Sequence, residues 1–395
     1  MRRRVLFLAE AVTWSQVVRL LVLARGLDPA RWDVHFAAAP AADALIGRAP
    51  GRRWPLRSLP PAVVEARLAR GGRLYDGATL DRYVDEELRL FAAVRPDVVV
   101  SDLRWSTTVS APVAGVRLAT LVDGYWFRPL AGYPIPDHPV VRLLGEVVVA
   151  HGFARGLRWM LRWFARPVNA LRRRHGLPLL DDLRDVLGFG DALLFPDDPA
   201  LVAADRPGTF LGPVRWAPDA PLPSWWDQLR RPVVYVTMGS SGPVGVVPAV
   251  LEALRGLDVD VVVSTAGRFA APAGVRAVEA LPGDVAARRA RVVVCSGGAS
   301  TGWQALAEGT PVVGLPANLD ACLAMACIAE AGAGIALRPT ATPAAIRAAV
   351  VRAMEDDVLR ARARALGTSA ARLDPHARFA AALAGRAPAR REASA

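Results

Sequence analysis

Two α/β domains with parallel sheets are predicted by three features of this sequence. Short apolar runs alternate with helical patterns in both halves of the chain, and strands that alternate with helices form parallel βαβ units. Six prolines lie between residues 205 and 232 among few helix signals, as is typical of a linker. The length of 395 residues exceeds that of one ordinary domain. We therefore expect a doubly wound α/β protein with two Rossmann-like domains that face a cleft.

The first half begins with a continuous apolar run at residues 5–9, which indicates a strand covered on both faces. A helical spacing follows at 15–25, and a second helix is predicted at 83–93, before Pro96. The other strands predicted in this half are 34–37, 98–100 and 118–122.

The alternation restarts after the proline-rich stretch. Strands are predicted at 233–237, 259–264, 292–295 and 311–315, with helices that begin near residue 248 and span 302–308. The domains that follow from this are an N-terminal domain at 1–212, a linker at 213–232, a C-terminal domain at 233–380 and a tail at 381–395. The tail is rich in Ala and Arg near its end, and we expect it to be frayed.

All 49 basic residues are arginine, because the sequence contains no lysine, and the net charge is +12. High Arg and Ala contents together indicate GC-rich coding in a bacterium, which weakens any functional argument from a single arginine. No zinc-ligand spacing, RNP-like strand or zipper is present, so we expect no nucleic-acid partner. The 53% hydrophobic content is enough for large buried cores.

Cys295, Cys322 and Cys327 contain no C-x-x-C pair, and three is an odd number. We interpret them as small buried side chains in a reducing cytoplasm, and we expect no metal site. Glu10 interrupts the apolar run that follows the arginine-rich start, which argues against a signal peptide. No run of about 18 apolar residues exists, so we predict no transmembrane span and a cytoplasmic location.

A turn of small residues follows the predicted strand at 292–295. Residues 296–301 are Ser-Gly-Gly-Ala-Ser-Thr, and Gly309 stands at the end of the helix 302–308. A strand, a glycine-rich turn and a helix place free backbone N–H groups and a helix N-terminus at the carboxyl edge of a sheet, where anions bind. The turn is therefore a candidate diphosphate site, although a glycine-rich turn without a ligand would have the same pattern.

A second loop of small residues, 237–242, follows the first strand of the same domain. Since the carboxyl ends of parallel strands meet at one edge of a sheet, we expect this loop near the first one. Two such loops in one domain favour a ligand site more strongly than either loop alone.

The second half of the chain resembles the donor-binding region of nucleotide-sugar-dependent glycosyltransferases with the GT-B fold, of the bacterial antibiotic and macrolide type. Their pattern is roughly H-G-G-x-G-T-x-x-E-A-L-x-x-G-x-P-x-v-x-x-P-x-x-x-D-Q. Residues 296–316, 318–320 and 331–334 are similar to that region, and 10–13 and 95–102 resemble the N-terminal half of the same group. The likeness covers most of residues 1–380.

The resemblance implies an inverting transfer in specialised metabolism, from a UDP- or dTDP-sugar to a hydrophobic, natural-product-like acceptor, with no other cofactor and by a monomer or a homodimer. A base removes a proton from the acceptor hydroxyl, which attacks the anomeric carbon. Backbone N–H groups and the helix dipole, rather than a metal, stabilise the leaving diphosphate. The donor-contacting residues that it implies are Gly239, Ser240, Ser296, Gly297, Gly298, Ser300, Thr301, Gln304 and Asp320.

Several positions depart from the family pattern. Ser296 replaces the His that contacts the diphosphate, and Ser300 replaces the Gly before Thr. Gln304 stands where a Glu would bind the ribose hydroxyls, and Ala321 replaces the Gln after Asp320.

The catalytic His of the family corresponds to about Gln16, and glutamine cannot act as a general base near neutral pH. The acid that orients this His corresponds to Asp102, which is present. Three interpretations stay open. Asp102, Glu10 or Asp123, at predicted strand ends facing the cleft, acts as the base. Or the acceptor is a phenol or carboxylate that needs little help. Or the protein has lost sugar transfer and is a binding or auxiliary subunit, or performs a different reaction. Histidines of the middle segment that could reach the cleft are His138, His151 and His175.

Residues 153–174 combine apolar residues at a spacing of three to four with seven arginines and no acid. The pattern predicts a basic amphipathic helix, interrupted near Pro167. Trp159 and Trp163 add aromatic bulk. Two interpretations are open: a core-facing helix with a solvated arginine face, or a hydrophobic acceptor entrance that contacts a membrane or binds a lipid-like or polyketide substrate.

Overall fold

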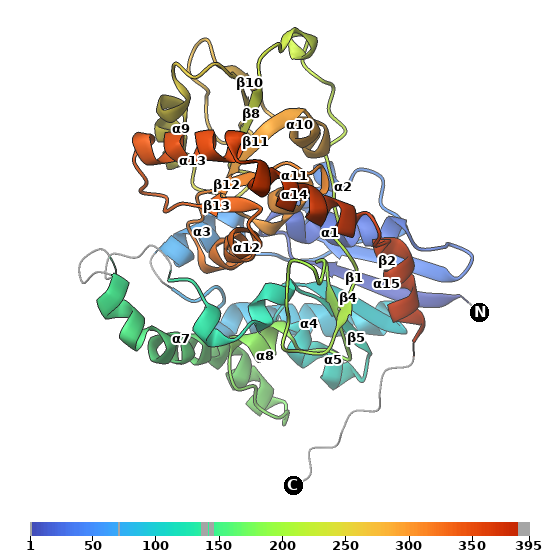
Figure 1. Ribbon diagram of the computed structural model, residues 1–395. Helices are drawn as coiled ribbons and strands as arrows, with labels where there is room; N and C mark the ends of the chain where they lie inside the picture. The colour runs from blue at the N-terminus through green and yellow to red at the C-terminus, as the bar shows by residue number, and fades with distance from the viewer. Residues whose placement is uncertain (1, 70–71, 136–140, 142–145, 386–395) are drawn as a thin grey trace.

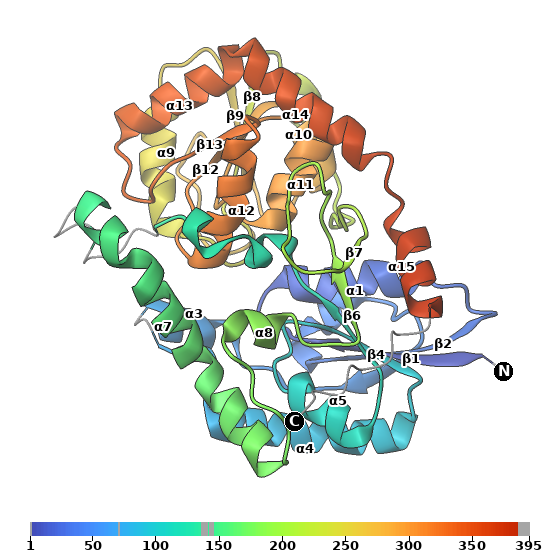
Figure 2. The ribbon, with the colours of Figure 1, turned by 60° about the horizontal axis from the view of Figure 1, so that its bottom comes forward.

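The structure of the chain, a computed structural model, describes residues 2–69, 72–135, 141 and 146–385. Two parallel sheets, each with helices around it, form two domains (Figure 1), which a second view separates clearly (Figure 2). The predicted fold class, α/β with two Rossmann-like domains, is confirmed.

Seven parallel strands form the N-terminal sheet, in the order β3-β2-β1-β4-β5-β6-β7. The chain moves outward from β1 to β3 and then returns to the other side of β1, so the carboxyl ends of β1 and β4 flank a topological switch point, where ligands of such sheets bind. The strands are β1 (Arg3–Ala9), β2 (Trp32–Ala38), β3 (Arg52–Pro55), β4 (Val98–Asp102), β5 (Leu118–Leu121), β6 (Ala192–Phe195) and β7 (Thr209–Phe210).

Helices cover both faces of this sheet because the side chains of its central strand alternate between two cores. The helices are α1 (Trp14–Arg25), α2 (Asp43–Ile46), α3 (Pro61–Ala69), α4 (Gly77–Val94), α5 (Thr107–Ala114), α7 (Glu146–Arg174) and α8 (Leu183–Leu187). Val5 and Phe7 are fully buried in a cluster with α1, whereas Leu6 and Leu8 are fully buried in a cluster with α4.

Six parallel strands form the C-terminal sheet, in the order β10-β9-β8-β11-β12-β13. Its strands are β8 (Val233–Thr237), β9 (Asp260–Ser264), β10 (Arg276–Val278), β11 (Ala290–Cys295), β12 (Val312–Gly314) and β13 (Gly334–Ala336). Its helices are α9 (Val247–Leu254), α10 (Gly283–Arg289), α11 (Ala299–Ala307), α12 (Leu319–Glu330), α13 (Pro343–Glu355) and α14 (Asp357–Ala370). Val234 and Val236 pack on α9 and α13, and Tyr235 packs on the opposite side with α10 and α11.

The last described helix, α15 (Pro375–Ala384), returns to the N-terminal domain (Figure 1). Phe379 is fully buried in the N-terminal core, and its ring centroid lies 6.0 Å from that of Phe7. Leu373, just before α15, lies against Gly212, where an added Cβ would come within 2.6 Å of it. The structure differs here from the predicted boundaries, because residues 375–380 belong to the N-terminal core and the start of the predicted tail is helical.

Two predicted elements have other bounds in the structure. Helix α11 begins at Ala299, three residues earlier than predicted, because Gly298 caps it with an extended backbone. Helix α7 continues through Pro167, so the predicted interruption is wrong. Val168 and Leu171 after the proline are as deeply buried as Leu161 before it, and this packing outweighs the cost of about 3 kcal/mol for an interior proline. Within the described residues, no helix has both the length and the apolar character needed to cross a membrane.

Candidate active site

The glycine-rich turn lies between β11 and α11, where a side chain at one position would not fit. Gly297 has a φ of +76°, and a Cβ there would come within 2.4 Å of Met325 Cγ. Its N–H donates to Cys295 Sγ at 3.3 Å. Ser300 and Thr301, which were predicted in the turn, lie in the first turn of α11, where backbone N–H groups have no partner within the helix. The turn thus presents free donors and the positive end of a helix dipole.

The second loop lies beside the first, as predicted, because β8 and β11 are neighbours and Thr237 pairs with Cys295. A Cβ on Gly242 would come within 2.4 Å of Ser296 Cβ. Gly239 has a φ of +62°, and its N–H donates to Thr237 Oγ1 at 3.2 Å. The loop also contacts the other domain, since the Trp14 N–H donates to Ser240 Oγ at 3.5 Å.

Gln304 is held by the protein itself. Its Nε2 donates to the Trp216 carbonyl oxygen in the linker at 2.5 Å. On the side of α10, a Cβ on Gly283 would come within 2.4 Å of Gln304 Oε1. The residue therefore joins α11 to the linker.

Asp320 faces the N-terminal domain. Its Oδ1 accepts hydrogen bonds from Tyr125 Oη at 3.0 Å and from Trp126 Nε1 at 2.8 Å. Both donors belong to the short helix η2 (Gly124–Phe127), which follows β5. A residue expected to contact the donor sugar is thus held by two donors of the opposite domain.

Asp102 and Asp123 share one buried cation, Arg19 of α1. Arg19 Nε and Nη2 donate to the two oxygens of Asp102, both at 3.0 Å, and Nη1 donates to Asp123 Oδ1 at 2.7 Å. Asp102 is 2% exposed. Burial raises its pKa to about 7, because desolvation and the charge of Asp123 outweigh the attraction of Arg19. The structure brings two of the predicted acids together, but both oxygens of Asp102 are already used.

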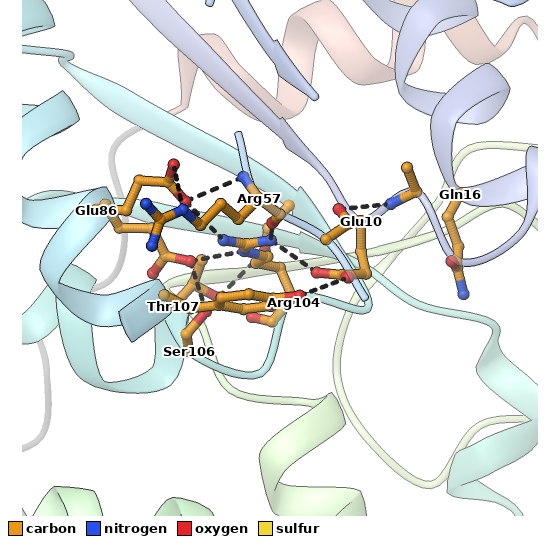
Figure 3. Close-up of polar contacts among 12 residues, drawn as sticks. Glu10, Gln16, Arg57, Glu86, Arg104, Ser106 and Thr107 are labelled. Carbon is orange, nitrogen blue, oxygen red and sulfur yellow. Dashed lines mark hydrogen bonds and ion pairs between the residues drawn. The ribbon is translucent and has the colours of Figure 1, made fainter. Parts of the chain in front are cut away.

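Glu10 lies in a second buried cluster (Figure 3). Arg104 donates through Nη1 to Glu10 Oε2 at 2.8 Å and through Nε to Glu87 Oε1 at 2.7 Å, and all three side chains are inaccessible to solvent. The Tyr83 ring lies 3.8 Å from the Arg104 guanidinium carbon. Burial raises the pKa of Glu10, and Arg104 opposes this rise. Glu10 is at a strand end, as predicted, but it does not face an open cleft.

Gln16 has a structural role at the start of α1. Its Oε1 accepts a hydrogen bond from the Thr13 N–H at 3.1 Å, which completes a capping box. In Figure 3 its side chain lies outside the Arg104 cluster. His175 is exposed beyond the end of α7 that points away from the C-terminal domain (Figure 2). His138 and the side chain of His151 lie outside the described residues.

Asp197 was missed by the sequence analysis. It is fully buried after β6, and it accepts hydrogen bonds from the Gly124 N–H at 2.7 Å and from Trp303 Nε1 of α11 at 3.2 Å. Burial and the charge of Asp123 raise its pKa to about 7. An interdomain cavity of about 10 Å³ lies beside it, room for about one water. The signal that could have found Asp197 is the pair of acids after the apolar run 192–195.

The cysteines are buried and unpaired, as interpreted from the sequence. Burial raises the pKa of the Cys295 thiol and that of the Cys327 thiol to about 11. In the part of the chain that the structure describes, no three His, Cys, Asp or Glu side chains are grouped as a metal ion would require.

Comparisons with known proteins bear on this arrangement. Residues 248–378 match the model of the erythromycin biosynthesis protein CIII-like C-terminal domain. A PGL/p-HBAD biosynthesis glycosyltransferase of Mycobacterium tuberculosis is 41% identical over 350 residues, which cover 85% of this chain and 81% of the relative. A PGL/p-HBAD biosynthesis rhamnosyltransferase of Mycobacterium bovis is 42% identical, over 85% of this chain and 77% of the relative.

The spinosyn rhamnosyltransferase SpnG, solved in complex with thymidine diphosphate, superposes with a TM-score of 0.68 at 21% sequence identity. The match covers 98% of this chain and all of that one, and it shows that the fold is GT-B. With more than 40% identity to two named enzymes over most of its length, this chain belongs to the family of the PGL/p-HBAD biosynthesis glycosyltransferases.

Proposed function

We propose that this glycosyltransferase moves a sugar, with inversion, from a dTDP-sugar to a hydrophobic acceptor. The observation that carries the proposal is the turn around Gly297, which presents free N–H groups and the N-terminus of α11 at the carboxyl edge of the C-terminal sheet. These groups suit the diphosphate of a leaving nucleotide, whose negative charge grows as the glycosidic bond breaks. The thymidine diphosphate complex of SpnG favours dTDP over UDP as the carrier.

A deoxyhexose is the sugar that we infer. One relative is named a rhamnosyltransferase. At the sugar-contacting positions of this chain, Asp320 provides a carboxylate but Ala321 provides no polar group. A deoxy sugar has fewer hydroxyls that need a hydrogen-bond partner. It therefore loses less binding free energy than a fully hydroxylated sugar at a position where the polar side chain is missing.

The general base that we infer is Asp123. Asp102 has both oxygens on Arg19, and Glu10 is enclosed with Arg104. Asp123 Oδ2, by contrast, has no recorded partner among the described residues. A carboxylate is a weaker base than the histidine of the family, so the acceptor would need an acidic hydroxyl such as that of a phenol.

A second candidate function rests on Gln16. Since its side chain caps α1, the place of the family's catalytic base is filled by a structural residue. This observation favours a protein that binds a nucleotide without transferring its sugar. Nucleotide binding alone does not separate the two candidates, whereas product formation does.

Calorimetry with dTDP and with UDP tests the diphosphate site. We expect dTDP to bind to the wild type. In Gly297→Ala the Kd for dTDP should rise at least about tenfold, because the new Cβ would displace the turn. Gly256→Ala is the matched control, since Gly256 also has a positive φ, of +74°, but its Cβ would meet nothing within 4 Å. Circular dichroism checks that both variants fold. If neither nucleotide binds at millimolar concentration, both candidate functions are wrong.

A further inference from the structure

The outer face of α7, defined here as the exposed side of residues 155–166, is not explained by the fold. The inner side of the helix is buried through Leu157, Leu161 and Ala165, which pack in the large core of the N-terminal domain. The outer side points away from the molecule, and α7 lies along its edge (Figure 2). A helix needs only its inner side for packing, so the residue types on the outer side are free to serve another purpose.

Four arginines occupy this outer face. Arg155, Arg158, Arg162 and Arg166 are exposed, and no ion pair or hydrogen bond is recorded for their side chains in the described residues. No acid occurs between residues 152 and 174 to compensate them. Further along, Arg174 is paired with Asp81 of α4 at 3.1 Å, so the neighbouring helix neutralises the end of α7 but not its outer face.

Two tryptophans lie among these arginines. Trp159 is 62% exposed, an unusual position for a large aromatic side chain in a folded protein. Its ring is stacked on that of Trp163, with centroids 6.4 Å apart and an angle of 14° between the planes. The guanidinium of Arg73 covers Trp163, 4.4 Å from the ring centroid. The stack thus holds Trp159 outward from the helix, on the side of the uncompensated arginines.

We propose that the outer face of α7 docks on the surface of an anionic lipid bilayer. Arginines in a row complement acidic headgroups, and tryptophan prefers the boundary between headgroups and acyl chains. An amphipathic helix of this kind lies in the interface, parallel to the bilayer. The buried side of α7 shares one core with Tyr125 and Phe127, which flank Trp126, a partner of Asp320. Docking therefore places α7 between the lipid and the core that contains Tyr125 and Phe127, whatever reaction occurs in the interdomain region.

Vesicle co-sedimentation with the full chain tests this proposal. Vesicles of phosphatidylcholine alone are compared with vesicles that also contain phosphatidylglycerol. We expect the partition coefficient to be at least about tenfold higher on the anionic vesicles at low salt, and to fall as salt screens the charges. Arg158→Glu/Arg162→Glu should lower it about tenfold or more. Trp159→Ala should lower it several-fold while keeping the salt dependence.

The matched control is Arg362→Glu/Arg372→Glu, which changes the net charge equally on and beside α14. Both arginines are exposed, and no side-chain ion pair is recorded for them in the described residues. The control should bind vesicles nearly as well as the wild type. Equal binding to both vesicle types, unchanged binding of Arg158→Glu/Arg162→Glu, or an equal loss in the control would overturn the proposal. Binding to a DNA duplex without binding to vesicles would assign the face to nucleic acid instead.

Discussion

At the scale of the residue, this protein contains two arginines that each bind two buried carboxylates. Arg19 joins Asp102 and Asp123, and Arg104 joins Glu10 and Glu87. Taking such groups out of water is costly, and the pairing repays the cost only while every partner is present. In both clusters the loss of the arginine would leave two acids that repel each other.

Arg19→Ala should therefore lower the free energy of unfolding by about 3–5 kcal/mol at pH 7.5. Burial raises the pKa of Asp102 from 3.8 to about 7, so its contribution to stability is present below pH 4 and is lost as the pH rises through 7. Without Arg19 the ionised form of Asp102 becomes still less favourable, and the variant should lose less stability at pH 5, where Asp102 is protonated. Urea denaturation at the two pH values measures this. An equal loss at both would show that Arg19 acts through packing alone.

Asp123→Asn should lower kcat by about a hundredfold or more, because it removes the base, while dTDP still binds. The assay would use dTDP-rhamnose and the phenol 4-methylumbelliferone. Asp102→Asn is the companion variant, since it alters the same arginine pair without removing the base. If Asp102→Asn abolishes turnover and Asp123→Asn does not, the assignment of the base is reversed.

Sequence reasoning reached the glycines of this site but not its ion pairs. Gly297 could be predicted because a tight turn that approaches a ligand closely needs glycine, so the residue type itself indicates the backbone conformation. The pairing of Arg19 with Asp102 depends on where α1 and β4 meet in space, and one arginine among 49 basic residues gave no local signal. For the same reason, Glu10 was predicted correctly at the end of a strand and Gln16 at the start of a helix, but the residues that they contact were not predicted.

At the scale of the element, the buried strands were the easiest to predict and the helix starts the hardest. The strand 233–237 was predicted with the bounds of β8, because a continuous apolar run has few alternatives. The start of α11 was placed three residues too late, since Ser300 and Thr301 are typical of turns and only the extended backbone of Gly298 decides the cap. Helix α15 was missed as a part of the N-terminal core, because core partners of Phe379 such as Phe7 and Phe36 are more than 300 residues away in sequence.

Phe379→Ala in α15 should destabilise the N-terminal domain by about 3–5 kcal/mol, the usual loss for a fully buried phenylalanine. Val358→Ala on α14 is the control, because Val358 is 69% exposed and should change stability by less than about 0.5 kcal/mol. Native-state hydrogen exchange locates the effect. Faster exchange in β1 and β2 is expected, whereas faster exchange confined to β8 and β11 would contradict the assignment of α15 to the first core.

At the scale of the whole molecule, the two domains meet through hydrogen bonds and an ion pair, and one of the side chains involved, Asp320, was predicted to contact the donor sugar. Asp320 accepts from Tyr125 and Trp126, and Asp197 accepts from Trp303. Arg128 also pairs with Glu330 at 2.7 Å. Since the interdomain cavity beside Asp197 has room for about one water, a nucleotide-sugar could enter at that point only if the domains part.

Trp126→Phe removes one of the two donors to Asp320 but keeps an aromatic side chain. Because these donors leave Oδ2 free and fix the orientation of the carboxylate, the KM for the sugar donor should rise about fivefold, with kcat little changed. Trp225→Phe in the linker is the control, as no hydrogen bond of its indole is recorded among the described residues. A fall in KM would mean that the hydrogen bond from Trp126 competes with the sugar for Asp320 instead of orienting the Asp320 carboxylate for the sugar.

The return of α15 also limits how the domains can part. The chain crosses between them twice, and at Gly212 and Leu373 the two crossings lie against each other. Two adjacent segments of chain resist twisting of one domain against the other far more than a single segment does. They therefore allow the domains to bend apart about one axis but not to rotate freely. Opening is then a rotation about this axis, and the gap is widest on the side of the molecule opposite to it.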